Sequence, residues 1–482
     1  MESFTVKDIC EATGGKLGWG DPAGVCDGGV FTDSRETGKG CVFVAIIGAR
    51  VDGHEYIPDV LSRGAACVIS SEPKEDADTS LGACVYVEDT VEALQKLAAW
   101  YRRRFDIPVI GVTGSVGKTS TKEMIGAVLS KKYKTLITYK NMNSQVGLSL
   151  MMFHLDSTIE MAVFEMGVSI PGEMDRLVDI AAPSAAVITN IGVSHIGNMG
   201  SRENICKEKG RIIRKFGDKG RLFACGNADL YDMITNNLPY DCCDGHCGTF
   251  FYGIESDFKE DISKLSFMAK DIYADEDGEH FTFVYPSGEA QVRLSAMGEH
   301  NVTNSLSALA IGLEYGVDIA DAIEAVGEYM PLDMRGALKS YGGASFIDDT
   351  YNASPDSIRS NIRAMFSYSG DARRIAVLGD VLELGEKSSE LHKSIGAFIE
   401  SEAAAGRRLD ALYTVGNESE IIVKYLNEHT DIPAKSCKDN FELINSLAEE
   451  IKDGDRVLFK GSRGMHLDEV VEALLRRQPD EA

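Results

Sequence analysis

The sequence lacks any apolar run long enough to cross a membrane. A membrane-spanning helix needs about 20 consecutive apolar residues, so we expect no membrane span. Residues 1–15 also lack the apolar core that a secretory signal requires. We therefore expect a cytoplasmic protein.

Basic residues are scarce relative to acidic ones. The chain has 49 lysines and arginines against 75 aspartates and glutamates, which gives a net charge of −26 at pH 7. Such a surface repels phosphates, so we expect no nucleic-acid partner. An acidic surface that keeps the protein soluble explains this charge without any further partner.

The cysteines do not have the pattern of a disulfide framework. There are 11 of them, an odd number, and they are scattered, which fits a reducing compartment. Cys242, Cys243, His246 and Cys247 are the one group with the residue types of a metal site. It lacks a second CxxC-type half and lies in a polar segment, so a zinc site is the less favoured interpretation.

With 482 residues, the chain is too long for one hydrophobic core and long enough for about three domains. We predict the domains 1–104, 105–330 and 331–482. Apolar strand patterns alternate with helical patterns, which predicts an α/β fold with parallel sheets and right-handed crossovers. The expected strands of the second and third domains are 107–112, 161–167, 185–190, 345–349, 375–380, 411–416 and 457–463. Antiparallel hairpins are expected over 250–297, with turns at Asp277-Gly278 and Ser287-Gly288.

A glycine-rich loop between an apolar strand and a helix predicts a phosphate-binding site. Backbone N–H groups of such a loop, together with the helix N-terminus, attract phosphate. Lys118 is expected to reach the β- and γ-phosphates of ATP, and Thr119 to place its hydroxyl on Mg²⁺. The loop residues expected to bind ATP are Thr113, Gly114, Ser115, Val116, Gly117, Lys118, Thr119 and Ser120.

Three further residues have ordinary structural interpretations when each is taken alone. Glu165 ends a buried strand pattern, where an acid often caps or meets solvent, although the carboxyl ends of parallel strands are also where ligands bind. His195 alone is more typical of a satisfied histidine than of a metal ligand, and Lys209 alone of a solvated helix lysine.

Together these segments resemble the central domain of the Mur ligase family. The resemblance rests on T-G-S-V-G-K-T at 113–119, F-E-M-G at 164–167, the run 190–203, and Lys209. It implies that Glu165 and His195 bind Mg²⁺, and that Lys209 is carbamylated and helps to bind a second Mg²⁺. Lys118, His195 and Lys209 are then the catalytic residues. The chain departs from the family at position 197, where Gly197 stands in place of a common acid.

The flanking segments extend the resemblance over all three domains. The first domain is similar to that of MurE and MurF ligases, which holds a uridine nucleotide; the residues implied are Ser34, Arg35, Asp52 and His54. Alone, these residues read as turn caps. Asn301 reads alone as a helix cap, whereas the resemblance places it near the adenine. In the third domain the residues implied to bind ATP are Arg335, Asp349, Tyr351 and Asn352.

Within the family, the third domain resembles the MurF type. The loop D-D-T-Y-N-A-S-P at 348–355 and the run from 377 to His392 are typical of that type, and the D-N-P box of the MurE type is absent. The implied fold is a central P-loop ATPase domain, a C-terminal Rossmann-like domain and a smaller N-terminal α/β domain. The implied activity is ATP-dependent addition of D-alanyl-D-alanine to UDP-N-acetylmuramoyl-tripeptide through an acyl phosphate.

Alternatives remain open at this point. Another amide ligase of the family, of the MurE or folylpolyglutamate synthase type, is the nearest one. A non-catalytic nucleotide-binding regulatory protein is the alternative from another class. The third peptide residue, lysine or diaminopimelate, is not specified by the sequence. We expect a monomer whose third domain closes toward the nucleotide by a hinge near Pro331.

Overall fold

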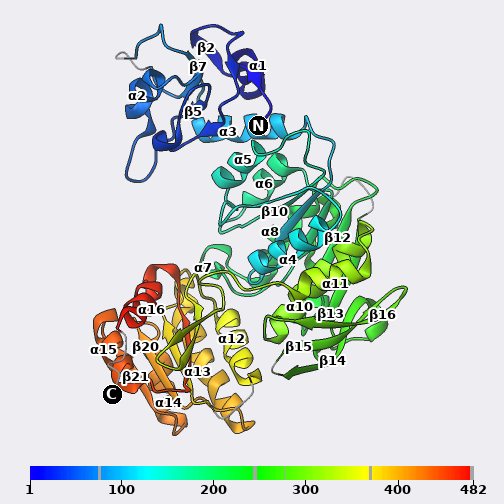
Figure 1. The fold of residues 1–482 in the computed structure, drawn as a ribbon, viewed down its shortest axis with the longest axis vertical. Helices are drawn as coiled ribbons and strands as arrows, with labels where there is room; N and C mark the ends of the chain where they lie inside the picture. The colour runs from blue at the N-terminus through cyan, green and yellow to red at the C-terminus, as the bar shows by residue number, and fades with distance from the viewer. Residues whose placement is uncertain (74–76, 243–246, 276, 369–371, 478–482) are drawn as a thin grey trace.

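The computed structural model describes residues 1–73, 77–242, 247–275, 277–368 and 372–477. These residues form three α/β bodies that follow one another along the long axis of the molecule (Figure 1). The predicted α/β class is confirmed. No helix in the described part of the chain is long and apolar enough to cross a membrane. Cys243 and His246, of the cysteine–histidine group considered for zinc, lie outside the described residues.

The N-terminal body contains a sheet with the strand order β2-β7-β6-β5-β4. Strands β4 to β7 run parallel, and β2 is antiparallel to β7. The strands and helices are β1 (Phe4–Thr5), α1 (Val6–Thr13), β2 (Lys16–Trp19), β3 (Val25–Cys26), β4 (Val30–Phe31), β5 (Val42–Val44), α2 (Ile57–Ser62), β6 (Cys67–Ser70), β7 (Ala83–Tyr86) and α3 (Thr90–Arg102).

Helix α3 joins this body to the next one and packs against α5 (Gln145–Met152) and α6 (Glu173–Ala181) of the central body. Its last residue, Arg102, is 7 % exposed. The guanidinium donates hydrogen bonds to the carbonyls of Ala181 at 3.1 Å, Phe105 at 2.6 Å and Ile107 at 3.0 Å. Burial lowers the pKa of Arg102 to about 10. The segment around residue 104 is therefore a fixed junction.

Replacing Arg102 by methionine is expected to destabilise this junction. The substitution leaves three carbonyls without their donor, and one buried polar group without a partner costs about 1–3 kcal/mol. We expect the free energy of unfolding to fall by at least about 2 kcal/mol. The exposed neighbour Arg103 supplies the matched control, Arg103→Met. Equal urea midpoints for the two variants would contradict the role given to Arg102.

The central body is built on a sheet with the order β16-β15-β14-β13-β12-β11-β8-β10-β9. Helices α4, α10 and α11 pack together over one face (Figure 1). The strands are β8 (Val109–Thr113), β9 (Thr135–Ile137), β10 (Met161–Glu165), β11 (Ala185–Ile188), β12 (Arg221–Cys225), β13 (Gly248–Ile254), β14 (Leu265–Asp275), β15 (Gly278–Tyr285) and β16 (Gly288–Leu294). The remaining helices of this body are α4 (Lys118–Ser130), α7 (Ile196–Met199), α8 (Arg202–Gly210), α9 (Leu230–Asn237), α10 (Glu299–Glu314) and α11 (Ile319–Gly327).

The hairpin prediction is confirmed for β14, β15 and β16, which pair antiparallel. It is wrong for β13, which runs parallel to both β12 and β14. The reason is a crossover on each side of β13, through α9 before it and through residues 255–264 after it, because parallel neighbours need a crossover connection and not a tight turn. The parallel strands predicted at 107–112, 161–167 and 185–190 are confirmed as β8, β10 and β11.

The C-terminal body follows the segment that contains Pro331. Its sheet has the order β17-β18-β22-β19-β20-β21, parallel except for β17. All four predicted strands are present, whereas the edge strands β17 and β21 are additions. Its elements are β17 (Ala337–Tyr341), β18 (Ala344–Asp349), α12 (Pro355–Ser367), β19 (Arg374–Gly379), α13 (Ser388–Ala404), β20 (Ala411–Val415), α14 (Glu420–His429), β21 (Ala434–Cys437), α15 (Asn440–Glu450), β22 (Arg456–Lys460) and α16 (Leu467–Arg476).

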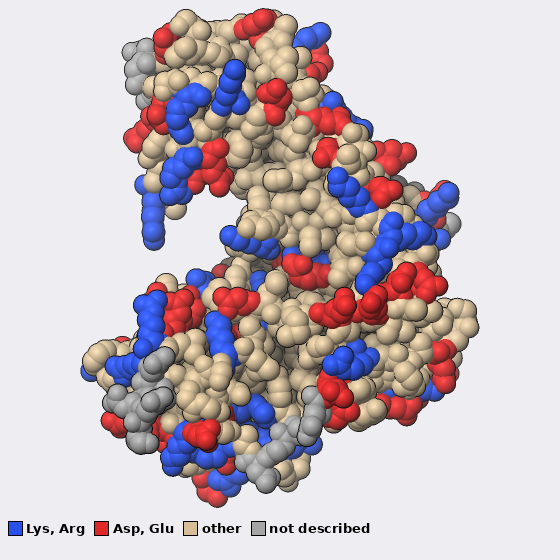
Figure 2. Space-filling model, viewed as in Figure 1, with Lys and Arg blue, Asp and Glu red and all other residues tan. Residues whose placement is uncertain are grey.

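A wide cleft opens between the N-terminal and C-terminal bodies, with the central body as its floor (Figure 2). The carboxyl ends of the central parallel strands carry the candidate site residues of β8 and β10. Ligands of open parallel sheets bind at that edge.

Candidate active site

The phosphate-binding loop has the geometry that its glycines predict. It connects β8 to α4, which begins at Lys118. Gly114 has φ 152° and Gly117 has φ 86°, both in the region that favours glycine. A Cβ on Gly114 would lie 2.0 Å from Thr189 Oγ1, and one on Gly117 would lie 2.7 Å from Asn304 Oδ1. The loop is therefore tightly enclosed by two segments that follow it in the chain.

Gly114→Ala is expected to weaken ATP binding by about 10- to 100-fold, because strained backbone costs about 1–3 kcal/mol. The loop must open to accept the methyl group, which moves its N–H donors. Gly217→Ala is the matched control, since a Cβ there meets nothing within 4 Å. Titration with a fluorescent ATP analogue measures the effect. Equal affinity for both variants would show that the loop tolerates the side chain.

Lys118 lies at the first position of α4, and its Nζ donates a 2.8 Å hydrogen bond to the carbonyl of Gly114. Loss of hydration lowers the pKa of Lys118; Arg335 acts in the same direction and Glu165 against it. The Lys118 ammonium is thus held against the phosphate-binding loop by the Gly114 carbonyl. A bound phosphate offers it a stronger, charged acceptor.

Glu165, at the end of β10, is 2 % exposed. Its Oε2 accepts a 2.8 Å hydrogen bond from Thr119 Oγ1, and its Oε1 accepts one of 2.7 Å from Asn143 Nδ2. The structure therefore brings together the hydroxyl and the carboxylate that the sequence assigns to Mg²⁺. Asn143, which orients the carboxylate, is a residue that the sequence analysis did not assign to the site.

His195 has a different partner. It adopts a left-handed conformation with φ 60°, and its Nδ1 forms an ion pair with Glu383 Oε2 of the C-terminal body. Burial lowers the pKa of His195, while Glu383 acts against that shift. Across the described residues no group of three or more His, Cys, Asp or Glu is gathered as a metal site. Glu165 and His195 therefore have separate partners in this structure.

Lys209 lies in α8 and is 2 % exposed. Its pKa is lowered well below the usual value, first by burial and next by the charge of Lys118. The acids Glu208 and Glu173 oppose this shift without reversing it. Lys209 is therefore a buried lysine beside the phosphate-binding lysine, which corrects its interpretation as a solvated helix residue.

The predicted ATP contacts of the third domain lie at the end of β18 (Asp349), on the loop after it (Tyr351 and Asn352) and just before β17 (Arg335). The Arg335 guanidinium stacks over the Tyr351 ring, 3.9 Å from its centroid. Asp349 forms an ion pair of 2.5 Å with Lys460, which also donates to the carbonyl of Asn352 at 3.0 Å. Lys460 was not predicted, because nothing near it in the sequence shows that β22 and β18 are neighbours.

Asn301, predicted to lie near the adenine, is 6 % exposed in the first turn of α10. Its Nδ2 donates a 2.9 Å hydrogen bond to the carbonyl of Met297. Asn304, one turn further along, accepts a 3.2 Å hydrogen bond from Thr121 Oγ1 beside the phosphate-binding loop. Helix α10 thus packs directly against α4, the helix that follows this loop.

The residues assigned to the uridine nucleotide have partners within the first domain. His54 is 4 % exposed; its Nδ1 lies 2.7 Å from Asp52 Oδ1, and its Nε2 accepts a 3.1 Å hydrogen bond from the Ser71 N–H. Arg35 is exposed and forms an ion pair with Asp33. That guanidinium lowers the pKa of Asp33 to about 2. The Ser34 carbonyl accepts a 2.6 Å hydrogen bond from the Arg63 guanidinium.

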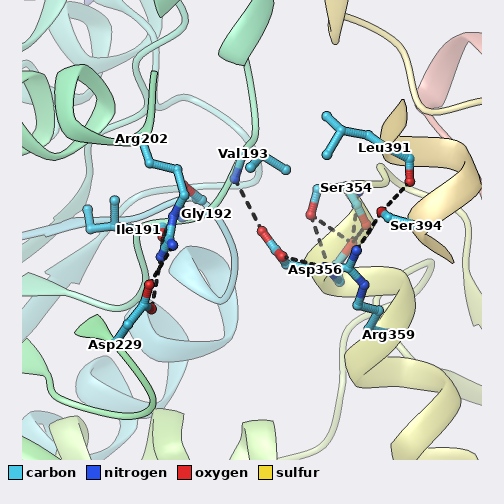
Figure 3. Close-up of polar contacts among 12 residues, drawn as sticks. Ile191, Gly192, Val193, Arg202, Asp229, Ser354, Asp356, Arg359, Leu391 and Ser394 are labelled. Carbon is cyan, nitrogen blue, oxygen red and sulfur yellow. Dashed lines mark hydrogen bonds and ion pairs between the residues drawn. The ribbon is translucent and has the colours of Figure 1, made fainter. Parts of the chain in front are cut away.

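The central and C-terminal bodies also meet at the loop that follows β11. The Val193 N–H donates a 3.2 Å hydrogen bond to Asp356 Oδ2, at the start of α12 (Figure 3). The Arg202 guanidinium binds the carbonyl of Ile191 at 2.8 Å and Asp229 at 2.7 Å, which fixes the other end of this loop. A Cβ at position 192 would lie 2.2 Å from Asp356 Oδ2, so a larger residue there would displace this carboxylate.

A glycine loop with a lysine, a strand-end acid and a second α/β body facing them define a P-loop nucleotide-dependent enzyme. Three family descriptions match the chain: "Mur ligase family, catalytic domain" over residues 28–102, "Mur ligase middle domain" over 112–312, and "Mur ligase, glutamate ligase domain" over 334–463. The chain belongs to the Mur ligase family, and within it to the MurF type.

The similar proteins agree over nearly the whole chain. UDP-N-acetylmuramoyl-tripeptide–D-alanyl-D-alanine ligase of Bacillus subtilis is 35% identical over 477 residues, 98% of this chain and 99% of that one. The Escherichia coli ligase of the same name is 30% identical over 98% and 99%. MurF from Acinetobacter baumannii superimposes with a TM-score of 0.85 at 29% identity, covering 99% and 100%. MurF from Thermotoga maritima in complex with ADP gives 0.79 at 30%, covering 93% and 97%.

Proposed function

We propose that this ATP-dependent amide ligase joins D-alanyl-D-alanine to UDP-N-acetylmuramoyl-tripeptide in peptidoglycan precursor synthesis. The observation that carries the proposal is the phosphate-binding loop, Lys118 included, facing a second α/β body within a chain similar to ligases of that name. A terminal carboxylate oxygen attacks the γ-phosphorus and ADP leaves. The dipeptide nitrogen then attacks the acyl carbon, the C–O bond breaks, and phosphate and a proton are released.

The donor set fits Mg²⁺ as the cofactor. Thr119 Oγ1 and Glu165 Oε2 are hard oxygen donors that lie 2.8 Å apart, and Mg²⁺ prefers oxygen ligands. Asn190 Oδ1 is a buried oxygen that has no hydrogen-bond partner in the described part of the chain. Thr119, Glu165 and His195 would hold one Mg²⁺, and a modified Lys209 would help to hold a second; both would neutralise phosphate charge when bound.

Carbamylation of Lys209 completes this set. A neutral amine adds to CO₂: an N–C bond forms and one proton leaves. Burial and the charge of Lys118 hold Lys209 toward its neutral form, because they lower its pKa. The product is an anion, which neighbouring cations stabilise.

The enzyme is further proposed to act as a monomer in the cytoplasm. The candidate site residues all come from one chain. Cysteines 10, 26, 41, 67, 84, 206, 225 and 437 are free thiols, as in a reducing compartment. Phosphate release from ATP and UDP-N-acetylmuramoyl-tripeptide, with and without D-alanyl-D-alanine, tests the function. Lysine and diaminopimelate forms of the substrate are compared. If phosphate release does not depend on the dipeptide but increases with another amine acceptor, the protein is another type of ligase. If no phosphate is released with any acceptor, the protein is a nucleotide-binding protein without ligase activity.

A further inference from the structure

Lys122 is a buried lysine that the proposed mechanism does not use. It lies on α4, three positions after Thr119, and its side chain is 0 % exposed. Its Nζ donates a 2.7 Å hydrogen bond to the Thr138 carbonyl and forms an ion pair of 2.6 Å with Glu123 Oε1. Replacing a buried ion pair by apolar residues is often neutral or stabilising. The stability of α4 alone therefore does not account for a lysine at this position.

The acceptor of that hydrogen bond, Thr138, directly follows β9 and is 1 % exposed. Its Oγ1 accepts a 2.8 Å hydrogen bond from the Glu165 N–H, and its own N–H donates one of 3.0 Å to the Val163 carbonyl. The paired residues of β9 and β10 end at Ile137 and Val163. Thr138 therefore extends the attachment of the two strands as far as Glu165, and Lys122 holds Thr138 from the side of α4.

The segment that begins at Thr138 also reaches the side chain of Glu165. Residues 138–144 connect β9 to α5, and Asn143 in this segment donates a 2.7 Å hydrogen bond to Glu165 Oε1. The Asn143 carbonyl accepts a 3.0 Å hydrogen bond from the Gly167 N–H, which lies just after β10. The segment is thus attached to β10 at two places, and it holds both the backbone and the carboxylate of Glu165.

Helix α4 holds Glu165 by two routes. The direct route is the 2.8 Å hydrogen bond from Thr119 Oγ1 to Glu165 Oε2. The indirect route runs from Lys122 through Thr138 to the Glu165 backbone. Residues three positions apart lie on the same face of a helix, so Thr119 and Lys122 share the face of α4 that packs against β10 (Figure 1). Because both routes start from the helix that follows the phosphate-binding loop, they set the position of the carboxylate relative to that loop.

We propose that Lys122 is a positioning residue, which places the Glu165 carboxylate for the divalent cation by holding Thr138. The inference rests on the proposed function, because it takes Glu165 as a ligand of that cation. The two hydrogen bonds of the Lys122 ammonium go to Glu123 and to the Thr138 carbonyl. Lys122 therefore acts on Glu165 through Thr138. Residues that orient a metal ligand without touching the metal typically contribute about 10- to 100-fold to metal affinity or activity.

The test is the affinity for Mn²⁺, used as a probe of the cation site in the presence of ADP and followed by electron paramagnetic resonance. Lys122→Met is expected to bind Mn²⁺ about 10-fold or more weakly than the wild type. Its affinity for a fluorescent ADP analogue in EDTA should be unchanged, because the phosphate-binding loop is not altered. Lys132→Met is the matched control, because Lys132, just after α4, donates a similar 2.7 Å hydrogen bond to the exposed carbonyl of Gly316.

Thr138→Val tests the same route without removing the buried charge. Valine keeps the shape of threonine and the carbonyl that Lys122 binds, but it lacks the hydroxyl that accepts the Glu165 N–H. This variant is expected to bind Mn²⁺ as weakly as Lys122→Met. Thr138→Ser keeps the hydroxyl and should bind Mn²⁺ as the wild type does. The two Thr138 variants decide the question if Lys122→Met does not fold.

Wild-type Mn²⁺ affinity in a folded Lys122→Met, or equal affinity of Thr138→Val and Thr138→Ser, would overturn the inference alone. Dipeptide-dependent phosphate release by the wild type, measured in parallel, reports on the proposed function. If that release is absent, the proposed function is overturned, while the Mn²⁺ affinities of the variants still test Lys122. If the wild type binds no Mn²⁺ with ADP, the cation site and the inference are both overturned.

Discussion

Replacing Lys118 by alanine is expected to lower kcat by about 100- to 1,000-fold, the loss typical when one preorganised donor to developing charge is removed. In the structure the Lys118 ammonium is held 2.8 Å from the Gly114 carbonyl. It is thus in place before phosphate arrives, and little reorganisation is needed as charge develops. Phosphoryl transfer depends mostly on such positioning and charge neutralisation.

The fold should survive this change, because Lys118 is only partly buried at the first position of α4. Thermal unfolding within a few degrees of the wild type would separate a catalytic loss from a folding defect. Lys131→Ala, just after the end of the same helix and paired on the surface with Glu324, serves as the control. Near-normal turnover of Lys118→Ala would rule out the role given to this lysine.

The second large effect is expected at Lys209. Lys209→Ala should lose about 100-fold or more in activity, since even residues that only support metal ligands cost 10–100-fold. ATP binding should persist, because the phosphate-binding loop is built from β8, α4 and the Thr189 segment rather than from α8. Nucleotide titration and phosphate release on the same preparation measure the two properties separately.

If Lys209 is carbamylated, the activity of the wild type should depend on bicarbonate. A role for the unmodified lysine predicts no such dependence. Wild-type activity should fall after thorough removal of bicarbonate and recover on its return. Intact mass measured under conditions that preserve carbamates should show one added CO₂, and Lys209→Ala should show none. Full activity with an unmodified ammonium at Lys209 and both metals bound would refute the modification.

The phosphate-binding loop could be predicted from the sequence because all its determinants are local. A buried strand, two glycines and a helix start stand within the segment 109–120, and their conformations follow from those residues alone. The same holds for Glu165, which a strand pattern places at the carboxyl edge of the sheet. The parallel strands themselves were predictable because each is a continuous apolar run between helical patterns.

The partners of the site residues could not be predicted in this way. Glu383 reaches His195 across 188 positions of the chain, and Lys460 reaches Asp349 across 111. The first contact depends on how two bodies are docked and the second on which strands become neighbours in a sheet, and no local pattern specifies either. His54 shows the same limit: the resemblance implies a ligand contact, which stays a prediction, and no local pattern shows that both ring nitrogens have partners within the domain.

The junction made by α3 has a consequence for substrate choice. Arg102 and the packing of α3 on α5 and α6 fix the distance between the first sheet and the phosphate-binding loop. A substrate whose nucleotide end is anchored in the first domain must span that distance to present its carboxylate. One extended residue covers at most about 3.3–3.6 Å, so a peptide that is one residue short stops that far from the γ-phosphate. With the nucleotide end held in the first domain, as the resemblance implies, we expect the junction to set the length of peptide that the enzyme accepts.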